Sequence, residues 1–263
     1  HTLHIYMLHA PDFLGYPSAV EMAKDHPDIV RDGLAIKKAG NAIVQVLGGR
    51  EVHPINVRVG GFYRVPAATE LHPLREQLLR ARDSAVETVR WAAALPFPAF
   101  ERSGDDAYEF VALSDPYEYP MNRGRIASTR GLDIPVEEYD QHFREEHVPY
   151  TNALHSVLAE RGAYLVGPMA RYNLNYACLS PLVRQVAEDI GFPPFVANPF
   201  RSIVVRALEV LYALDEAVRI IDHYTPPETP YLESAPRATT GCAATEAPRG
   251  LLYHRYRLDD RGK

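Results

Sequence analysis

The segment from residue 200 to residue 223 most strongly limits what this chain can fold into. Its apolar residues recur at helical spacing, and the resulting stripe consists of Val204, Leu208, Leu211, Val218 and Ile221, widened by Ile203, Val210 and Leu214. A helix that is apolar around most of its circumference is stable only when other elements cover it. The segment therefore predicts a buried helix inside a helical bundle.

Similar periodicity predicts further helices around this one. They cover residues 1–10, 27–47, 71–94, 133–161 and 178–190. The first helix is expected to end at the Pro11-Asp12 corner, and the second to stop at Gly48-Gly49. Pro149 is expected to bend the helix that begins at residue 133.

Shorter segments alternate in the way that strands do. Residues 50–66 carry a Gly-Gly break and predict short strands or a bulged hairpin, and Tyr108–Leu113 predicts a strand. Residues 225–240 are proline-rich and predict a long irregular loop. The predicted fold class is mainly α (α+β), with a helix-bundle core and small β-hairpin insertions, in a single domain over residues 1–263.

Charge and cysteine content exclude several classes of function. The net charge of −6 argues against non-specific nucleic-acid binding, which needs a basic surface. The two cysteines, Cys178 and Cys242, form no CxxC pair and no disulfide framework, and both are expected to be buried as small apolar residues. No apolar run approaches the roughly 20 residues that span a bilayer. A cytoplasmic location is therefore expected.

Both ends of the sequence suggest that it continues in a longer protein. It opens on His1, already within a helical pattern, and it closes on "LDDRGK", a predicted turn with no strand to pair with. We therefore expect an internal piece of a longer chain.

Near the end of the sequence, "EAPRGLLYHRY" places a proline directly before an arginine. Pro248 fixes its own φ and biases Ala247 towards an extended backbone, so that Arg249 is delivered in a constrained direction at the start of a strand. Such an arginine suits a fixed positive charge over a pocket. A structural ion pair between Arg249 and Glu246 is an equally good interpretation of the local sequence.

Two groups of histidines could be taken for metal ligands. His1 and His4 lie at i, i+3 on one predicted helix face, but no carboxylate joins them, which favours histidines that pack behind a site over metal ligands. Residues 140–155 are also rich in histidine and glutamate. His142 and His147 are five positions apart and diverge around a helix, which favours a solvated face.

Two glycine-containing segments have simple structural interpretations. Gly48 and Gly49 follow a predicted helix, so they indicate a helix C-cap and not a phosphate-binding loop, which would precede a helix. The segment "GPMARYNLN", residues 167–175, predicts a turn into a helix, with Arg171 in a structural ion pair.

Four segments, in order along the chain, resemble the large, catalytic subunit of nickel–iron hydrogenases. They are "HTLHIYMLHAPDF" (1–13), "GNAIVQVLGGREVHPINVRVGGF" (40–62), "YLVGPMARYNLN" (164–175) and "TEAPRGLLYHRY" (245–256). The last two resemble the family's Gly-Pro-x-Ala-Arg and Glu-Ala-Pro-Arg-Gly motifs.

The resemblance implies a chemistry for the intact enzyme. In that family a nickel and an iron ion, bridged by cysteine thiolates and with CN and CO on the iron, split H2 heterolytically. The arginine of the Ala-Pro-Arg-Gly motif lies over the open face of that Ni-Fe(CN)2(CO) centre. The resemblance thus makes Arg249 the catalytic residue, and Pro248, Ala247 and Glu246 the residues that line its pocket.

The same resemblance implies supporting residues and partners. His1, His4 and Arg171 are expected to lie behind the pocket. The "ARYNLN" and "HRYRLDD" segments are most similar to the cytoplasmic branch of the family, which exchanges electrons with NAD(P) or a deazaflavin. The implied partners are flavin/NAD(P) or deazaflavin reductase subunits, together with an iron–sulfur small subunit.

The cysteines depart from the family pattern. The four nickel ligands come from an Arg-x-Cys-Gly-x-Cys motif before the segment of His1 and an Asp-Pro-Cys-x-x-Cys motif after that of Lys263, and neither is present. Cys178 and Cys242 fit neither motif and are not assigned as ligands. Because a nickel–iron pair of this type needs soft thiolates, we expect no metal centre on this piece and no activity from it alone.

Two other functions remain open. The chain could be a metal-free homologue, such as the quinone-site subunit of respiratory complex I, or a non-catalytic scaffold for an iron–sulfur partner. Residues 1–13 and 170–175 favour the hydrogenase, because the family pattern is more specific there.

Overall fold

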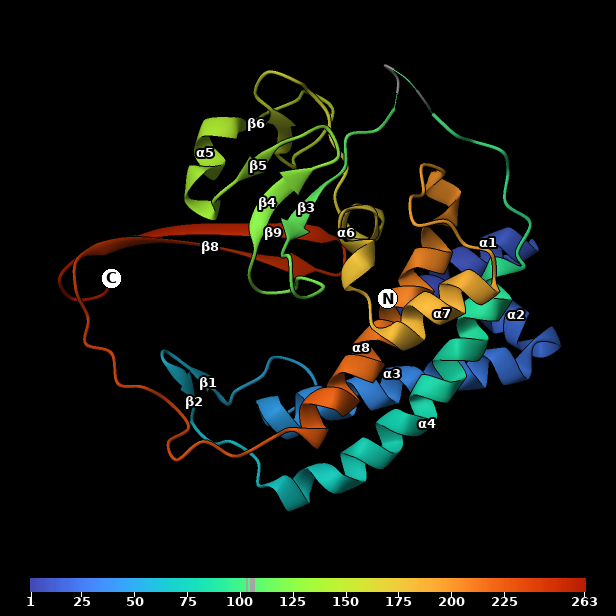
Figure 1. The fold of residues 1–263 in the computed structure, drawn as a ribbon, viewed down its shortest axis with the longest axis horizontal. Coiled ribbons are helices and arrows are strands. Elements are labelled where there is room, and N and C mark those ends of the chain that lie inside the picture. Colours follow the sequence, from blue (N-terminus) through green and yellow to red (C-terminus); the bar gives the residue numbers. More distant parts are fainter. Residues whose placement is uncertain (103, 105–106) are drawn as a thin grey trace. The chain divides into compact units, whose positions relative to one another are not determined.

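The computed structural model describes residues 1–102, 104 and 107–263 (Figure 1). The chain forms two compact units. Unit 1 comprises His1–Phe97, Ser180–Phe192 and Arg206–Pro236, and unit 2 comprises Pro98–Leu179, Pro193–Val205 and Arg237–Lys263. The single domain over residues 1–263 remains a prediction.

Unit 1 is built from helices. They are a π-helical segment His4–His9, α1 (Ala10–Leu14), α2 (Ala19–Asp25), α3 (Pro27–Gly48), α4 (Ala68–Ala93), α7 (Pro181–Asp189) and most of α8 (Ser202–Asp222). The predicted stripe of α4 is buried from Leu71 to Ala92, and Leu208 and Leu211 of α8 are fully buried. These long helices are confirmed because each has a continuous apolar stripe that the bundle buries. The predicted C-cap at Gly49 is also confirmed, with φ +84°.

A small hairpin in unit 1 joins α3 to α4. Its strands are β1 (Val57–Arg58) and β2 (Gly61–Phe62), which pair antiparallel. This confirms the short hairpin expected from the Gly-Gly break.

Unit 2 contains the remaining strands. Strands β3 (Val111–Ser114), β4 (Arg125–Ser128) and β5 (Asp133–Ile134) form an antiparallel sheet in that order. Strands β6 (Phe143–Glu146) and β7 (His155–Leu158) pair with each other, as do β8 (Thr239–Ala247) and β9 (Gly250–Leu258). The core consists of Val111, Leu113, Ile126, Leu132, Ile134, Phe143, Leu158 and Ala244.

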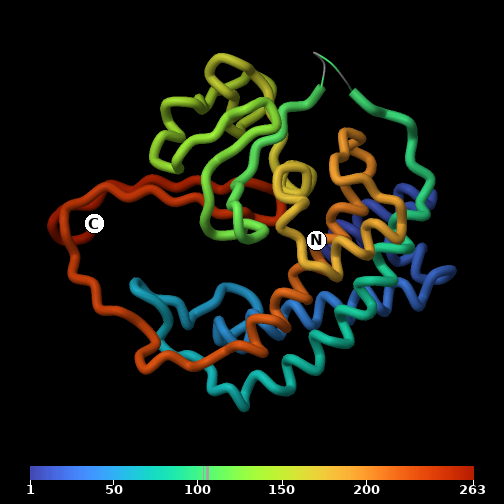
Figure 2. The backbone as a smooth tube through the Cα atoms, in the orientation of Figure 1, coloured from blue at the N-terminus to red at the C-terminus, as the bar shows by residue number. Residues whose placement is uncertain are grey.

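Two helices and three short 3-10 turns complete unit 2. The helices are α5 (Tyr139–His142) and α6 (Pro168–Asn175), and the turns are Val136–Glu138, Tyr176–Cys178 and Pro199–Arg201. Figure 2 traces the hairpin β8–β9 in red, from its open end near the C-terminus to its closed turn. Helix α6 packs against β3 and the closed half of this hairpin.

The helix predicted over residues 133–161 is wrong. This region forms β5, a 3-10 turn, α5 and the hairpin β6–β7. The register pairs Phe143 with Leu158, and both side chains enter the core of unit 2. Tertiary burial of these cross-strand pairs outweighs local helix propensity, and Pro149 lacks the N–H that a continuous helix would need.

Other boundaries also differ from the expectations. The first helical region passes through Pro11 and ends at Leu14, because Pro11 lies in the first turn of α1, where its missing N–H costs no bond. The helix predicted over residues 178–190 starts at Pro181, after Ser180 caps it. The strand at the end of the chain is confirmed, but its partner β8 was not predicted. Within the described part of the chain, no helix is both long and apolar enough to cross a bilayer.

Candidate functional site

The closed turn of the β8–β9 hairpin carries Pro248 and Arg249. The register pairs Ala247 with Gly250, which leaves these two residues as the turn itself. Proline fits this position because its missing N–H lies outside the ladder of the two strands. Arg249 therefore lies at an exposed tip and not at the start of a strand, which corrects the sequence-based placement.

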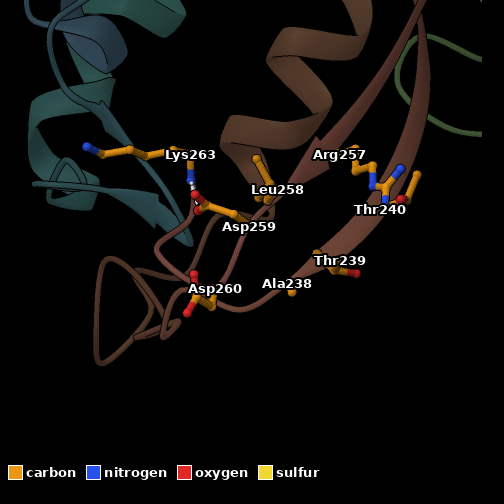
Figure 3. Close-up of a pocket in the computed structure, with 8 residues that line it drawn as sticks. All are labelled: Ala238, Thr239, Thr240, Arg257, Leu258, Asp259, Asp260 and Lys263. Carbon is orange, nitrogen blue, oxygen red and sulfur yellow. Dashed lines mark hydrogen bonds between the residues drawn. The ribbon is translucent and has the colours of Figure 1, made fainter.

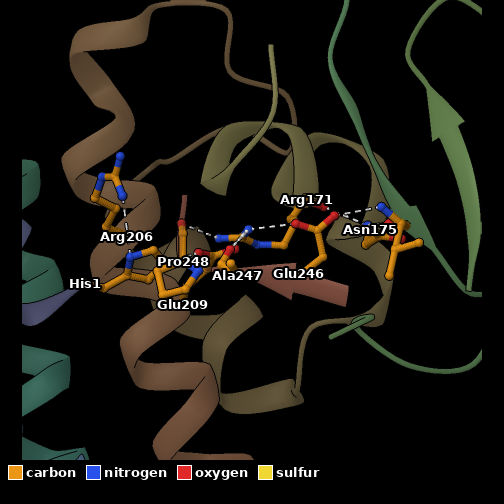
Figure 4. A network of polar contacts seen from close by, with 9 residues as sticks. His1, Arg171, Asn175, Arg206, Glu209, Glu246, Ala247 and Pro248 are labelled. Atoms are coloured by element: carbon orange, nitrogen blue, oxygen red, sulfur yellow. Dashed lines mark hydrogen bonds and ion pairs between the residues drawn. The ribbon is translucent and has the colours of Figure 1, made fainter. Parts of the chain in front are cut away.

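A buried ion pair lies directly beneath this tip. The side chain of Arg171, on α6, is 2% exposed, and that of Glu246, at the end of β8, is 0% exposed. Nη1 of Arg171 donates to Oε2 of Glu246 at 2.9 Å and to the carbonyl oxygen of Ala247 at 2.8 Å, and Nη2 donates to that of Pro248 at 3.1 Å (Figure 4). One guanidinium thus binds three consecutive residues that lead into the tip.

Glu246 connects the hairpin to the central sheet of unit 2. Its Oε1 accepts a hydrogen bond from the backbone N–H of Leu113 at 2.8 Å, and its own N–H donates to the carbonyl of Met121 at 2.7 Å. Its carboxylate faces Arg171. The alternative in which Glu246 pairs with Arg249 is therefore wrong, and the structural ion pair expected for Arg171 is confirmed.

Asn175 supports the pair from the other end of α6. Its Nδ2 donates to the carbonyl oxygens of Leu113 at 2.9 Å and Arg171 at 3.0 Å. Its Oδ1 is buried and has no hydrogen-bond partner among the described residues. The sequence analysis did not select Asn175, although it belongs to the same motif as Arg171.

Glycines allow the loop before α6 to touch the tip. Gly167 has φ +101°, and a Cβ there would lie 2.8 Å from the carbonyl oxygen of Arg249. Gly250 has φ +140°, and a Cβ there would lie 2.5 Å from a side-chain carbon of Val166 and 2.9 Å from the nitrogen of Gly167. Only glycine combines these backbone angles with so close an approach, so the two motifs lock together through their backbones.

The guanidinium of Arg249 differs from that of Arg171. Among the described residues it has no ion pair and no hydrogen-bond partner, and the residue is exposed. A guanidinium keeps its charge at any working pH and offers five N–H donors. The arrangement therefore presents a permanent cation on a turn that a buried ion pair holds from below.

His1 and His4 belong to unit 1. Nε2 of His1 lies 2.5 Å from Oε2 of the buried Glu209, and Nδ1 lies 3.4 Å from Nη1 of Arg206. The rings of His1 and His4 have centroids 6.3 Å apart. Their place behind the pocket of Arg249 remains a prediction. The sequence analysis missed Glu209, although a carboxylate within the apolar stripe of α8 was a visible signal.

The cysteines do not form a metal site. Both are half-buried and neither is in a disulfide, so the expectation of full burial is wrong. Sγ of Cys178 lies 3.4 Å from the carbonyl oxygen of Asp115, and that of Cys242 lies 3.4 Å from the hydroxyl of Tyr253. Over residues 1–102, 104 and 107–263, no group of three or more His, Cys, Asp or Glu side chains could hold a metal ion. Two separate thiols do not fit a four-thiolate nickel–iron centre.

The histidines of residues 140–155 lie at or near the surface of unit 2. His147, after β6, is exposed, whereas His142, at the end of α5, is half-buried. The solvated face that we expected is therefore confirmed for His147 only, and it is not part of a long helix.

A surface hollow of about 670 Å³ lies at the open end of the β8–β9 hairpin (Figure 3). It is lined by strand-end and turn residues, including Thr240, Arg257 and Lys263. Asp259 accepts hydrogen bonds from the backbone N–H groups of Arg261 and Lys263, which satisfies its carboxylate within the turn. Strands of nine residues separate this hollow from Arg249, so it is not part of the predicted pocket.

Comparisons with known proteins connect this fold to one enzyme family. No family model matches the chain. The alpha subunit of sulfhydrogenase 2 of Pyrococcus furiosus is 30% identical over 262 residues, which are 99% of this chain and 60% of that subunit. One chain of the F420-non-reducing hydrogenase vhu of Methanocaldococcus jannaschii is 27% identical over the whole of the present chain, which covers 68% of it. The beta subunit of the NAD-reducing hydrogenase HoxS of Cupriavidus necator is 24% identical, with 60% of its length covered.

Solved structures share the fold. A chain of an NAD+-reducing [NiFe]-hydrogenase matches with a TM-score of 0.78 at 19% identity, over 99% of this chain and 63% of that one. A [NiFeSe] hydrogenase from Desulfovibrio vulgaris Hildenborough matches with a TM-score of 0.72 at 19% identity, over 100% of this chain and 66% of that one. The chain spans about 60% of the length of the first of these curated relatives. In sequence and in fold it belongs with the large (alpha) subunits of NiFe hydrogenases.

Proposed function

We propose that these 263 residues are part of the hydrogen-activating subunit of a NiFe hydrogenase, which oxidises H2 and reduces protons reversibly. The observation that carries the proposal is Arg249: at an exposed turn, its guanidinium has no partner among the described residues, and a fully buried ion pair holds that turn. A surface arginine without function needs no such support, because exposed charges are stable in water.

Arg249 would act through its fixed charge and its donors. A preorganised cation stabilises charge that develops on a bound reactant, and it does so most strongly where water is excluded. Lysine could not replace it fully, because lysine lacks the planar fork and can lose its proton. Pro248 and Ala247 then form the wall beside it, while the buried Glu246 lies behind that wall. The nickel–iron centre of the relatives supplies the redox chemistry, and no step at the metals is assigned to the residues of this chain.

The partners follow from the relatives as a class. Those relatives are subunits of multi-subunit hydrogenases, and their names differ in electron acceptor. We propose that the direct partner is an iron–sulfur small subunit. A flavin/NAD(P) or deazaflavin reductase subunit would carry electrons to a soluble acceptor in the cytoplasm.

The sequence that flanks the 263 residues tests this proposal. We expect a Cys-Gly-x-Cys motif on the N-terminal side and an Asp-Pro-Cys-x-x-Cys motif on the C-terminal side, together with nickel and iron in the purified full-length subunit. A native start codon and stop codon at the present borders would refute it. A full-length chain that lacks both cysteine pairs and binds no metal would favour the metal-free homologue instead.

A further inference from the structure

We infer that Arg171 is a positioning residue, which sets the direction of Arg249 by fixing the backbone of the hairpin tip. The inference rests on the proposed role of Arg249, although its structural part can be tested independently. Arg171 does not face the pocket itself, because it is almost fully buried.

The contacts of Arg171 go beyond those of an ordinary ion pair. Besides the carboxylate of Glu246, its guanidinium donates to the carbonyl oxygens of Ala247 and Pro248, the two residues directly before Arg249. A peptide plane whose carbonyl is held has little freedom in the adjoining φ and ψ angles. Holding two consecutive planes therefore restricts the orientation of the Cα–Cβ bond of Arg249.

The loop before α6 closes the remaining side of the tip. Gly167 packs against the carbonyl of Arg249, and Val166 packs against Gly250. Arg171 is tied to the same loop, because its backbone N–H donates to the carbonyl of Gly167 at 3.0 Å. The tip thus lies between the loop and the guanidinium, both of which belong to one short segment of unit 2.

The contacts need an arginine specifically. Its fork directs Nη1 and Nη2 to separate acceptors at the same time, whereas a lysine ammonium is a single point on a flexible stem. Arg171→Lys should keep the charge beside Glu246 and lose the simultaneous hold on Ala247 and Pro248. This substitution therefore separates the positioning role from a purely structural one.

The test measures backbone exchange in the full-length subunit within its natural complex. Hydrogen–deuterium exchange of the peptide that covers residues 246–251 would be compared in the wild type, Arg171→Lys and Arg171→Met. We expect exchange to rise about tenfold in Arg171→Lys, because a lost hydrogen bond to a charged group is worth about one such factor. We also expect the melting temperature of Arg171→Lys to stay near that of the wild type, and H2/D2O isotope exchange to fall.

The control is Arg161→Met, in the same unit. Arg161 donates to the buried carboxylate of Glu109 at 2.8 Å and has no contact with the tip. It should leave exchange at residues 246–251 unchanged. If Arg171→Met does not fold, trypsin cleavage after Arg249 in Arg171→Lys gives a second measure, and faster cleavage there than in the control supports the inference.

The outcomes separate the two claims. Unchanged exchange and unchanged cleavage at the tip of Arg171→Lys would overturn the positioning role, whatever the activity. A loosened tip with full H2 activation in both Arg171→Lys and Arg249→Lys would instead overturn the catalytic role of Arg249, while the hold on the backbone would stand.

Discussion

Removal of one member of the Arg171–Glu246 pair should destabilise the subunit far more than removal of both. Glu246→Leu leaves the guanidinium of Arg171 buried without its carboxylate, and Arg171→Met leaves the carboxylate of Glu246 buried without its cation. Each loss of one partner from a buried pair costs about 3–5 kcal/mol. Two independent losses would therefore sum to about 6–10 kcal/mol.

The double variant should cost much less than this sum, because it leaves no unpaired charge. Two kinds of loss remain. The N–H of Leu113 loses its acceptor, which costs about 1–3 kcal/mol, and the carbonyls of Ala247 and Pro248 lose a donor, which costs about 1–2 kcal/mol. We therefore expect a total of about 3–5 kcal/mol and a coupling energy of about 3 kcal/mol or more.

The assay is a double-mutant cycle from urea unfolding of the full-length subunit, followed by circular dichroism. Arg161→Met provides the comparison, because the side chain of Arg161 is 41% exposed. Its loss should cost only about 1 kcal/mol, since solvent screens an exposed guanidinium. Additive effects, with a coupling energy below about 0.5 kcal/mol, would refute the reasoning about burial.

Three further predictions concern other parts of the chain. Gly250→Ala should destabilise by about 1–3 kcal/mol, because φ is +140° and the new Cβ would meet Val166 at 2.5 Å; Gly241→Ala on the same hairpin, with nothing within 4 Å, should be neutral in the same melting experiment. Burial raises the pKa of Tyr6 to about 12, so its contribution to stability is present below pH 10 and is lost as the pH rises towards 12; Tyr6→Phe should flatten this alkaline loss in urea titrations, and an unchanged slope would contradict it. Desolvation, followed by a nearby arginine charge, lowers the pKa of His9, so stability should fall as the pH drops below about 6.5, and His9→Gln should remove that dependence.

The long helices could be predicted from the sequence because the evidence for each is local. The stripes of α4 and α8 recur over many turns, and the bundle buries those same side chains. The region 133–161 could not be predicted in this way. Its strands are four residues long or shorter, and what selects them is the pairing of Phe143 with Leu158, which no local pattern contains.

The candidate site was predictable in part, for a similar reason. The local sequence singled out Arg249 through its proline, and the family resemblance singled out Arg171. The pair of Arg171 with Glu246 joins residues 75 positions apart, and from local sequence Glu246 was assigned to its nearer neighbour Arg249. The nearer cation was the wrong partner, because the turn at Pro248 directs Arg249 outwards while α6 brings Arg171 underneath.

The most direct test of the central claim is Arg249→Lys in the full-length protein, assembled with its natural partners. Nickel and iron content would be measured together with H2/D2O isotope exchange, which needs no electron acceptor. We expect unchanged metal content and a fall in exchange of about 10²–10³-fold, the range for removal of one preorganised donor. Arg257→Lys, at the open end of the same hairpin, should leave exchange unchanged. Full isotope exchange by Arg249→Lys with its metals retained would contradict the catalytic role of Arg249.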